Sequence, residues 1–169
     1  MTVRLWYPQL DAYDAVRRMV GLLAHWSKEH PSLERLYICD FFLANPPLLH
    51  RTNMPRETRN EFSALGIEKP EHAFLSYPSA PVLFQKMAEV QKQALRTLVG
   101  KGLTDLVEWE SGRVALSKEG WSVFRPHINI LIREDEVPII SFLSRKFARI
   151  GQNDMAEFHR RTGLRRSIR

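Results

Sequence analysis

The sequence is poor in the residues that disulfide-bonded, nucleotide-hydrolysing and metal-binding proteins depend on. Cys39 is the only cysteine among 169 residues, so the chain cannot form an internal disulfide bond. The eight glycines do not fall in the spacing of a phosphate-binding loop, which argues against ATP hydrolysis by this chain alone. The six histidines are dispersed and show no paired ligand spacing, so we expect no metal and no cofactor.

Long apolar segments are also missing. A membrane-spanning helix needs about 20 consecutive apolar residues, whereas the longest candidates, residues 38–42 and 137–143, are short and interrupted by Asp40 and Pro138. Residues 1–10 have no cationic segment leading into an apolar one, as a secretory signal would. Together with the single cysteine, these features predict a cytoplasmic protein without membrane contact.

Positive charge is in excess, but it is concentrated at one end of the chain. The formal net charge is +6, and residues 159–169 hold five arginines and no acid. The remaining chain has 20 basic and 19 acidic residues, so the folded body is almost neutral. A basic tail of this kind attracts polyanions without sequence preference, although a solvated terminus explains it equally well.

The apolar periodicity predicts mostly helices, and 44% hydrophobic residues suffice for the core of one domain. We expect helices over residues 12–28, 33–44, 55–65, 81–99, 137–150 and 153–161. Asp11 and Ser32 are suited to cap the first two helices, and Asp14 lies four residues before Arg18. The second helix is apolar on nearly all sides and should form the centre of the domain.

Residues 81–121 follow the order of a winged helix-turn-helix. A long helix ends at a glycine stop, Gly100, and a β-hairpin and the start of another helix follow. Residues 106–116 alternate apolar and polar side chains around Ser111-Gly112, which suits a two-residue hairpin turn.

The expected strand register gives this hairpin two faces. Val107 and Trp109 would be covered by the helices, together with Val114 and Leu116. The outer face would present three charged side chains, those of Glu108, Glu110 and Arg113. Carboxylates repel phosphates, so this surface favours contact with a protein over contact with DNA.

The expected fold class is mainly α with a small β-hairpin, a winged helix-turn-helix core plus C-terminal helices. The winged-helix domain would span residues 1–125, a helical extension 126–158 and the basic tail 159–169. The pattern allows residues 121–162 either to pack on this core or to form a separate docking arm. It allows a monomer or a homodimer.

Two residues of the apolar second helix are candidates for chemistry. Cys39 lies among Ile38, Phe41 and Phe42, where a thiol is usually an inert small hydrophobe rather than a nucleophile. Asp40 needs a partner or a shifted pKa in these surroundings, and a structural hydrogen bond or ion pair is favoured over catalysis. A catalytic acid would need a second titratable group that the sequence does not identify, so we expect no enzyme.

Basic residues are the candidate contacts to nucleic acid. Lys86, Lys92 and Arg96 share the polar side of one helix, where Glu89 partly offsets their charge. Further candidates follow in the C-terminal part of the chain: Arg145, Lys146, Arg149, Arg160, Arg161, Arg165 and Arg166. A DNA-binding winged-helix transcriptional regulator is therefore the main alternative to a protein-binding role.

Two blocks of the sequence resemble a known family. The first, residues 7–19, begins Tyr-Pro-Gln-Leu-Asp-Ala-Tyr-Asp-Ala. The second, residues 33–46, is similar to the pattern Arg-x-x-x-x-Asp-aromatic-aromatic-Leu-x-x-Pro, with Arg35 and Asp40 at the charged positions. The family comprises the middle components of prokaryotic three-component ABC systems, small winged-helix proteins encoded between an ABC-type ATPase and an effector or sensor. The likeness covers mainly residues 7–50, with a looser fit through the expected hairpin to about residue 120.

This resemblance implies a non-catalytic adaptor that bridges an ATPase of the structural-maintenance-of-chromosomes type and an effector, in defence against phage or plasmids. It supplies no catalytic residues. Arg35 and Asp40 would form a structural pair or belong to a protein interface, with Glu108, Glu110 and Arg113 as further interface candidates.

Overall fold

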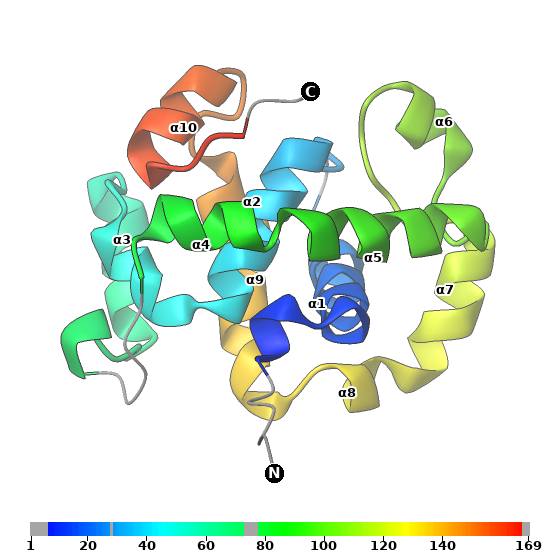
Figure 1. The fold of residues 1–169 in the computed structure, drawn as a ribbon, viewed down its shortest axis with the longest axis horizontal. Coiled ribbons are helices and arrows are strands. Elements are labelled where there is room, and N and C mark those ends of the chain that lie inside the picture. The colour runs from blue at the N-terminus through cyan, green and yellow to red at the C-terminus, as the bar shows by residue number, and fades with distance from the viewer. Residues whose placement is uncertain (1–6, 28, 73–77, 167–169) are drawn as a thin grey trace, which may run out of the picture.

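The computed structural model describes residues 7–27, 29–72 and 78–166, and within these ranges helices predominate (Figure 1). The longer helices are α1 (Ala12–His25), α2 (Leu33–Ala44), α3 (Arg56–Ala64), α5 (Ala88–Gly100), α9 (Val137–Arg145) and α10 (Met155–Thr162). The shorter helices are α4 (Ala80–Lys86), α6 (Leu106–Glu110), α7 (Lys118–Phe124) and α8 (Ile128–Leu131). The 3-10 turns are η1 (Pro8–Leu10), η2 (Pro46–Arg51), η3 (Pro70–His72), η4 (Arg125–His127), η5 (Glu134–Glu136) and η6 (Phe147–Arg149).

Side chains at the predicted positions start the first two helices. Asp11 Oδ1 accepts the amide hydrogen of Asp14 at 3.0 Å, and Ser32 Oγ accepts that of Arg35 at 3.3 Å. Each bond satisfies a donor that a helix end would otherwise leave unpaired. The second helix has the predicted bounds, whereas the first ends three residues early, where Trp26 adopts an extended conformation.

The central helix is α2, which is buried from residue 35 to residue 43. It packs against α1 and α9, and α1 also packs against α5. One hydrophobic core joins side chains from Ala15 to Leu164 and includes Ile140, Phe147 and Phe158. The C-terminal helices therefore pack on the N-terminal ones, which decides between the two arrangements that the sequence allowed.

Aromatic rings connect the helices through the centre of this core. Phe41 and Phe42 of α2 meet edge to face at a centroid distance of 5.1 Å. Phe41 continues to Phe84 of α4 at 5.4 Å, and Phe42 continues to Phe147 at 5.3 Å. Phe147 in turn contacts Phe158 of α10 at 5.6 Å. Edge-to-face pairs add directional contacts to the area that the rings bury.

The predicted helix 81–99 is divided at Met87 into α4 and α5, which lie nearly in line (Figure 1). Gly100, the expected left-handed stop, is still part of α5. The stop lies two residues later at Gly102, with φ of 69°, and the amide of Leu103 donates to the carbonyl of Leu98 at 2.9 Å. This bond closes the end of α5 as in a Schellman-type cap.

The predicted helix 137–150 is interrupted after Arg145, and η6 follows. Arg35 of α2 accounts for the shape of this segment. Its Nη1 donates to the carbonyls of Ala148 at 2.5 Å and Ile150 at 2.8 Å, and its Nη2 donates to Gly151 at 2.7 Å. A buried guanidinium thus pairs the carbonyls of Ala148 and Ile150 after the helix end, and it shares the Gly151 carbonyl with the amide of Asp154.

The predicted β-hairpin over residues 106–116 is wrong, because its first strand is the helix α6. Asp105 Oδ1 accepts the amides of Val107 and Glu108 at 2.9 and 3.0 Å, which starts a helix in place of a strand. Within the described residues we find no β-sheet, only isolated bridges between Thr104 and Leu116 and between Ser32 and Arg113. The winged-helix core expected from the hairpin therefore has no support in the structure.

Candidate protein-docking site

Helix α6 lies on a loop that stands away from the other helices at one end of the molecule (Figure 1). Leu106 and Val107 are 66% and 75% exposed, and Trp109 is 36% exposed. The covered face predicted for Val107 and Trp109 is therefore wrong. Large apolar side chains exposed side by side mark candidate interaction sites, because burying each would contribute up to about 1.5–3 kcal/mol.

The base of this loop is fixed although its tip is exposed. Val114 and Leu116 are buried, as the sequence predicted. The amide of Val114 donates to the carbonyl of Pro31, and the amide of Asp105 donates to that of Ala115, both at 2.9 Å. These bonds hold the loop against the start of α2, so α6 presents its side chains from a fixed position.

The charged residues predicted for the outer face lie on and after the same helix. Glu110 and Arg113 are exposed. Glu108 is half-buried, and its Oε2 atom is buried without a hydrogen bond in the described part of the chain. A five-residue helix thus mixes acidic and apolar side chains, which the two separate faces of a hairpin would not do.

The two charged positions of the family pattern are not on the surface. Arg35 is 6% exposed and Asp40 is fully buried, so direct contact of Asp40 with another protein is excluded in this conformation. They do not form the pair with each other that the sequence allowed, because Arg35 binds backbone carbonyls and Asp40 binds Arg18. The structural role favoured for Asp40 agrees with this geometry.

A network of charged and amide groups surrounds Asp40. Arg18 donates from Nε to Asp40 Oδ1 at 2.7 Å and from Nη1 to Asp14 Oδ2 at 2.5 Å. The Gln91 amide donates to Asp40 Oδ2 at 2.7 Å, and Arg166 Nη1 donates to Gln91 Oε1 at 2.6 Å. The series joins α1, α2, α5 and the segment after α10, so it supports the body that carries α6.

The electrostatic surroundings differ at the two arginines of this network. Burial alone would lower the pKa of Arg18, but the carboxylates of Asp40 and Asp14 raise it above its ordinary value. Burial lowers the pKa of Arg166 to about 10, and coulombic attraction to Tyr37 and Asp40 offsets part of this effect. Both arginines are charged at neutral pH.

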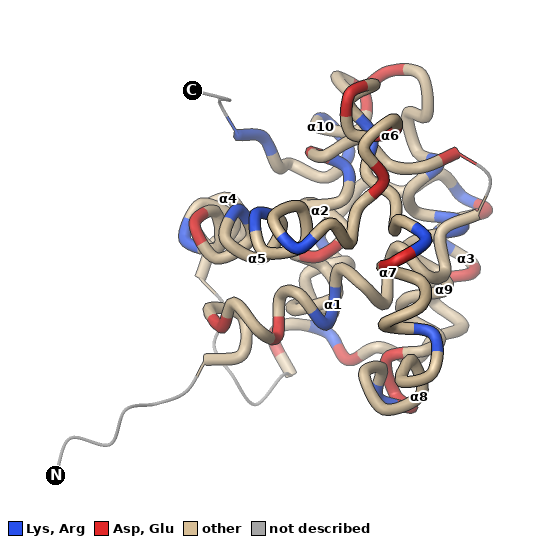
Figure 2. The backbone as a smooth tube through the Cα atoms, turned by 90° about the vertical axis from the view of Figure 1, so that its right-hand side faces the viewer, with Lys and Arg blue, Asp and Glu red and all other residues tan. Residues whose placement is uncertain are grey.

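The basic residues predicted to contact nucleic acid lie on several elements of the fold. Figure 2 shows Lys and Arg on α4 and α5 and others in the C-terminal segments. Lys146 pairs with Glu61 at 2.8 Å, and Arg161 pairs with Glu157 at 2.8 Å. Lys92 lies 3.5 Å from Glu89. The candidates that are exposed and have no ion pair among the described residues are Lys86, Arg96, Arg145, Arg149, Arg160 and Arg165.

The two residues considered as candidates for catalysis, Cys39 and Asp40, are fully buried. Cys39 is fully buried, and burial raises the pKa of its thiol to about 12, so a thiolate is disfavoured at neutral pH. Across residues 7–27, 29–72 and 78–166, no group of three His, Cys, Asp or Glu side chains is placed to hold a metal ion. In the same ranges no helix has both the length and the apolar character to cross a membrane.

Comparison with known families gives a match along nearly the whole chain. The sequence model of the ABC-three component (ABC-3C) system Middle Component 5 family matches residues 4–167. The chain is a member of this Middle Component 5 family. The resemblance seen in residues 7–50 is thereby confirmed at the level of the family and extended in length. Neither the curated proteins nor the solved structures include a significant match to the chain.

Membership gives this Middle Component 5 protein a place within a system of several components, which implies partner components. Sequence reasoning missed the partners of Asp40, because Arg18 and Gln91 lie 22 and 51 residues away along the chain. It also missed the exposed character of α6. The signal for α6 was Asp105, a residue type that favours a helix start, directly before the apolar pair Leu106 and Val107.

Proposed function

We propose that this protein is a non-catalytic adaptor that bridges an ATPase of the structural-maintenance-of-chromosomes type and an effector in prokaryotic defence. The observation that carries the proposal is the exposure of Leu106, Val107 and Trp109 on α6. Membership in a middle-component family supports it, because such a component has partners within its own system. The ATPase supplies nucleotide hydrolysis, and this chain supplies the surface that connects the ATPase to the effector.

Helix α6 is the proposed contact to one partner, with Glu110 and Arg113 as polar residues at its edge. An interface of this kind has an apolar centre that excludes water and a charged rim that fixes orientation. Trp109 is the strongest single anchor, because tryptophan side chains dominate the binding energy of many interfaces. Docking would cover the apolar side chains that the isolated chain leaves in water.

The test is co-expression with the ATPase and effector subunits encoded next to the gene, followed by affinity purification. We expect the wild-type chain to retain the ATPase subunit. Leu106→Ser combined with Val107→Ser should weaken that retention without changing the thermal midpoint, because both side chains are exposed in the free chain. Ile130→Ser is the matched control, since Ile130 is 81% exposed on α8, away from α6. If the wild-type chain retained neither the ATPase subunit nor the effector subunit, the proposal would be overturned.

A further inference from the structure

A cavity of about 510 Å³ lies beside α6. Its walls come from residues 26, 27 and 29–32 between α1 and α2, Arg35 of α2, residues 111–113 after α6, residues 144, 148 and 149, and residues 152, 153 and 155 at the start of α10. The volume is within the range of about 300–1,000 Å³ that is typical of ligand pockets. The walls are more polar than apolar, so the cavity suits a charged group.

The charge on these walls is predominantly positive. Arg35, Arg113 and Arg149 line the cavity, and Glu29 is the one carboxylate among its described lining residues. In the described part of the chain, none of the three arginines has a carboxylate within 4.0 Å. Glu29 instead accepts a hydrogen bond from Gln152 at 3.4 Å. An anion could therefore enter without displacing an internal ion pair.

Three further features favour an anion at this place. Burial lowers the pKa of Arg35, although attraction to Cys39 and Glu34 offsets part of this effect. Its guanidinium donates to the carbonyls of Ala148, Ile150 and Gly151 and lies 4.2 Å from the centre of the Phe158 ring. The Ser27 hydroxyl is buried and has no hydrogen-bond partner among the described residues. The α2 helix begins next to Ser32 in the cavity wall, and a helix N-terminus carries partial positive charge.

The cavity lies at the C-terminal end of α6. Ser111 and Gly112 follow α6 directly and line the cavity, so a chain segment lying on Leu106 and Val107 can reach into it. An extended polyanion fits this surface poorly, because Glu110 and Glu108 of α6 would repel its phosphates. A peptide that offers one carboxylate to the hollow and apolar side chains to α6 matches both parts.

We propose that this cavity binds an Asp or Glu carboxylate of a partner subunit, on a segment whose apolar side chains cover α6. The inference rests on the adaptor function proposed above and names the chemistry of the docking segment. Arg113 and Arg149, which are exposed, reach the carboxylate first, and the charge of Arg35 attracts it from the wall.

The experiment uses the full chain and two fluorescein-labelled peptides, Gly-Leu-Glu-Glu-Leu-Gly and its amide counterpart Gly-Leu-Gln-Gln-Leu-Gly. Fluorescence anisotropy at near-physiological salt should show saturable binding of the acidic peptide. The amide peptide should bind more weakly by a factor of roughly ten or more, because it lacks the two side-chain carboxylates that the arginines recognise. Arg113→Gln combined with Arg149→Gln should abolish this difference between the peptides.

The matched control is Arg145→Gln combined with Arg160→Gln, which removes the same charge from exposed positions outside the cavity. It should change the affinity by no more than roughly two-fold. Equal losses in both double variants, equal binding of both peptides, or displacement of the acidic peptide by a twelve-nucleotide single strand at equal concentration would each overturn the inference.

Co-purification separates this inference from the adaptor proposal. When the wild-type chain retains its ATPase or effector, the Arg113→Gln and Arg149→Gln double variant should retain that partner poorly. Undiminished retention would overturn the cavity inference and leave the adaptor function standing. Absence of retention by the wild-type chain would overturn the adaptor function and, with it, the assignment of the carboxylate to a partner subunit.

Discussion

Arg18 and Asp40 form a two-pronged ion pair between α1 and α2, with Nε–Oδ1 and Nη2–Oδ2 distances of 2.7 and 3.2 Å. Their side chains are 1% and 0% exposed. A pair so far from water stabilises the fold only while both partners are present, because either charge alone is costly to bury.

Asp40→Asn should lower the free energy of unfolding by about 3–5 kcal/mol, since it leaves the Arg18 guanidinium without its main counter-charge. Urea unfolding followed by circular dichroism measures the loss. Lys92→Gln serves as the control, because Lys92 and Glu89 form an exposed pair that is worth at most about 1 kcal/mol. A cost for Asp40→Asn as small as that of the control would contradict the structural role of the buried pair.

The contribution of Glu136 to stability should depend on pH. Arg17 donates to both of its carboxylate oxygens, at 2.6 and 3.0 Å. Burial alone would raise the pKa of Glu136, but these bonds lower it below its ordinary value of 4.5. Because the folded-state pKa is below that of the unfolded chain, the stabilisation is complete above about pH 5 and is lost as the pH falls through the folded-state value.

Glu136→Gln should therefore cost about 1.5–3 kcal/mol at pH 7 and progressively less below the pKa of the unfolded chain. Denaturant titrations at several pH values measure the difference from wild type. The control is Glu134→Gln, since Glu134 lies in the same turn and is exposed, and this substitution should have little effect on stability at any pH. A cost for Glu136→Gln that does not change between neutral and strongly acidic pH would argue against this assignment.

Gly120 of α7 and Gly100 of α5 should respond in opposite ways to alanine. A Cβ atom on Gly120 would collide with the backbone carbonyl of Leu103, whereas one on Gly100 would meet nothing within 4 Å. We expect Gly120→Ala to cost about 1–3 kcal/mol through overpacking, and Gly100→Ala to add about 0.4–1 kcal/mol by restricting the unfolded chain. Thermal unfolding by calorimetry distinguishes them, and equal shifts would speak against the packing of α7 on Leu103.

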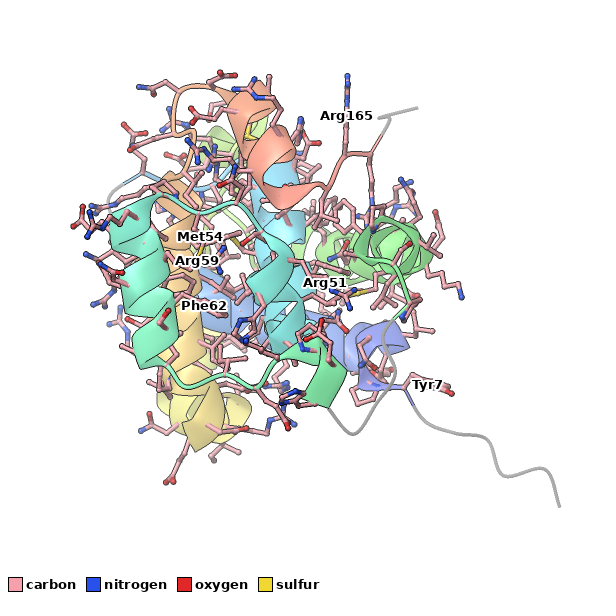
Figure 3. All side chains as sticks on the ribbon, turned by 90° about the vertical axis from the view of Figure 1, so that its left-hand side faces the viewer. Tyr7, Arg51, Met54, Arg59, Phe62 and Arg165 are labelled. Atoms are coloured by element: carbon pink, nitrogen blue, oxygen red, sulfur yellow. The ribbon has the colours of Figure 1, made fainter. Side chains whose placement is uncertain are left out.

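Arg166 and its neighbour Arg165 offer a matched pair at the basic end of the chain. Arg166 lies over the Phe84 ring at 3.6 Å from its centroid, whereas Arg165 points away from the helices (Figure 3). Arg166→Gln should speed amide hydrogen exchange at Leu164 by roughly ten-fold or more, because a charge-assisted bond and a cation–π contact are lost. Arg165→Gln should leave that exchange unchanged, and a similar acceleration in both variants would refute the docking of Arg166.

Local signals made the N-terminal half of the fold predictable. Asp11 and Ser32 are efficient helix caps, and the apolar run after Ser32 is too continuous for an element exposed on one side. These signals act within a few residues of each other, so a single sequence contains them. The bounds of α2 were predicted correctly for this reason.

Two other features were beyond local reasoning. Residues 106–110 are too few for the helical period to be distinguished from strand alternation, and Ser111-Gly112 suits a hairpin turn as well as a helix stop. The arginine that pairs with Asp40 lies on a different helix, while the family pattern draws attention to Arg35 on the same one. Tertiary packing decided both cases.

The contact of Arg166 with Gln91 and Phe84 has a practical consequence for dissecting this protein. A truncated protein that ends before residue 166 would expose the Phe84 ring of α4. It would also leave the side-chain amide oxygen of Gln91 in α5 without the hydrogen bond from Arg166. Loss of affinity for any polyanion in such a deletion would then report damaged architecture as much as missing charge. Glutamine replacements at Arg160 and Arg165 remove positive charge and leave the contacts of Arg166 in place. They are therefore a better test of the role of charge near the C-terminus than a truncation.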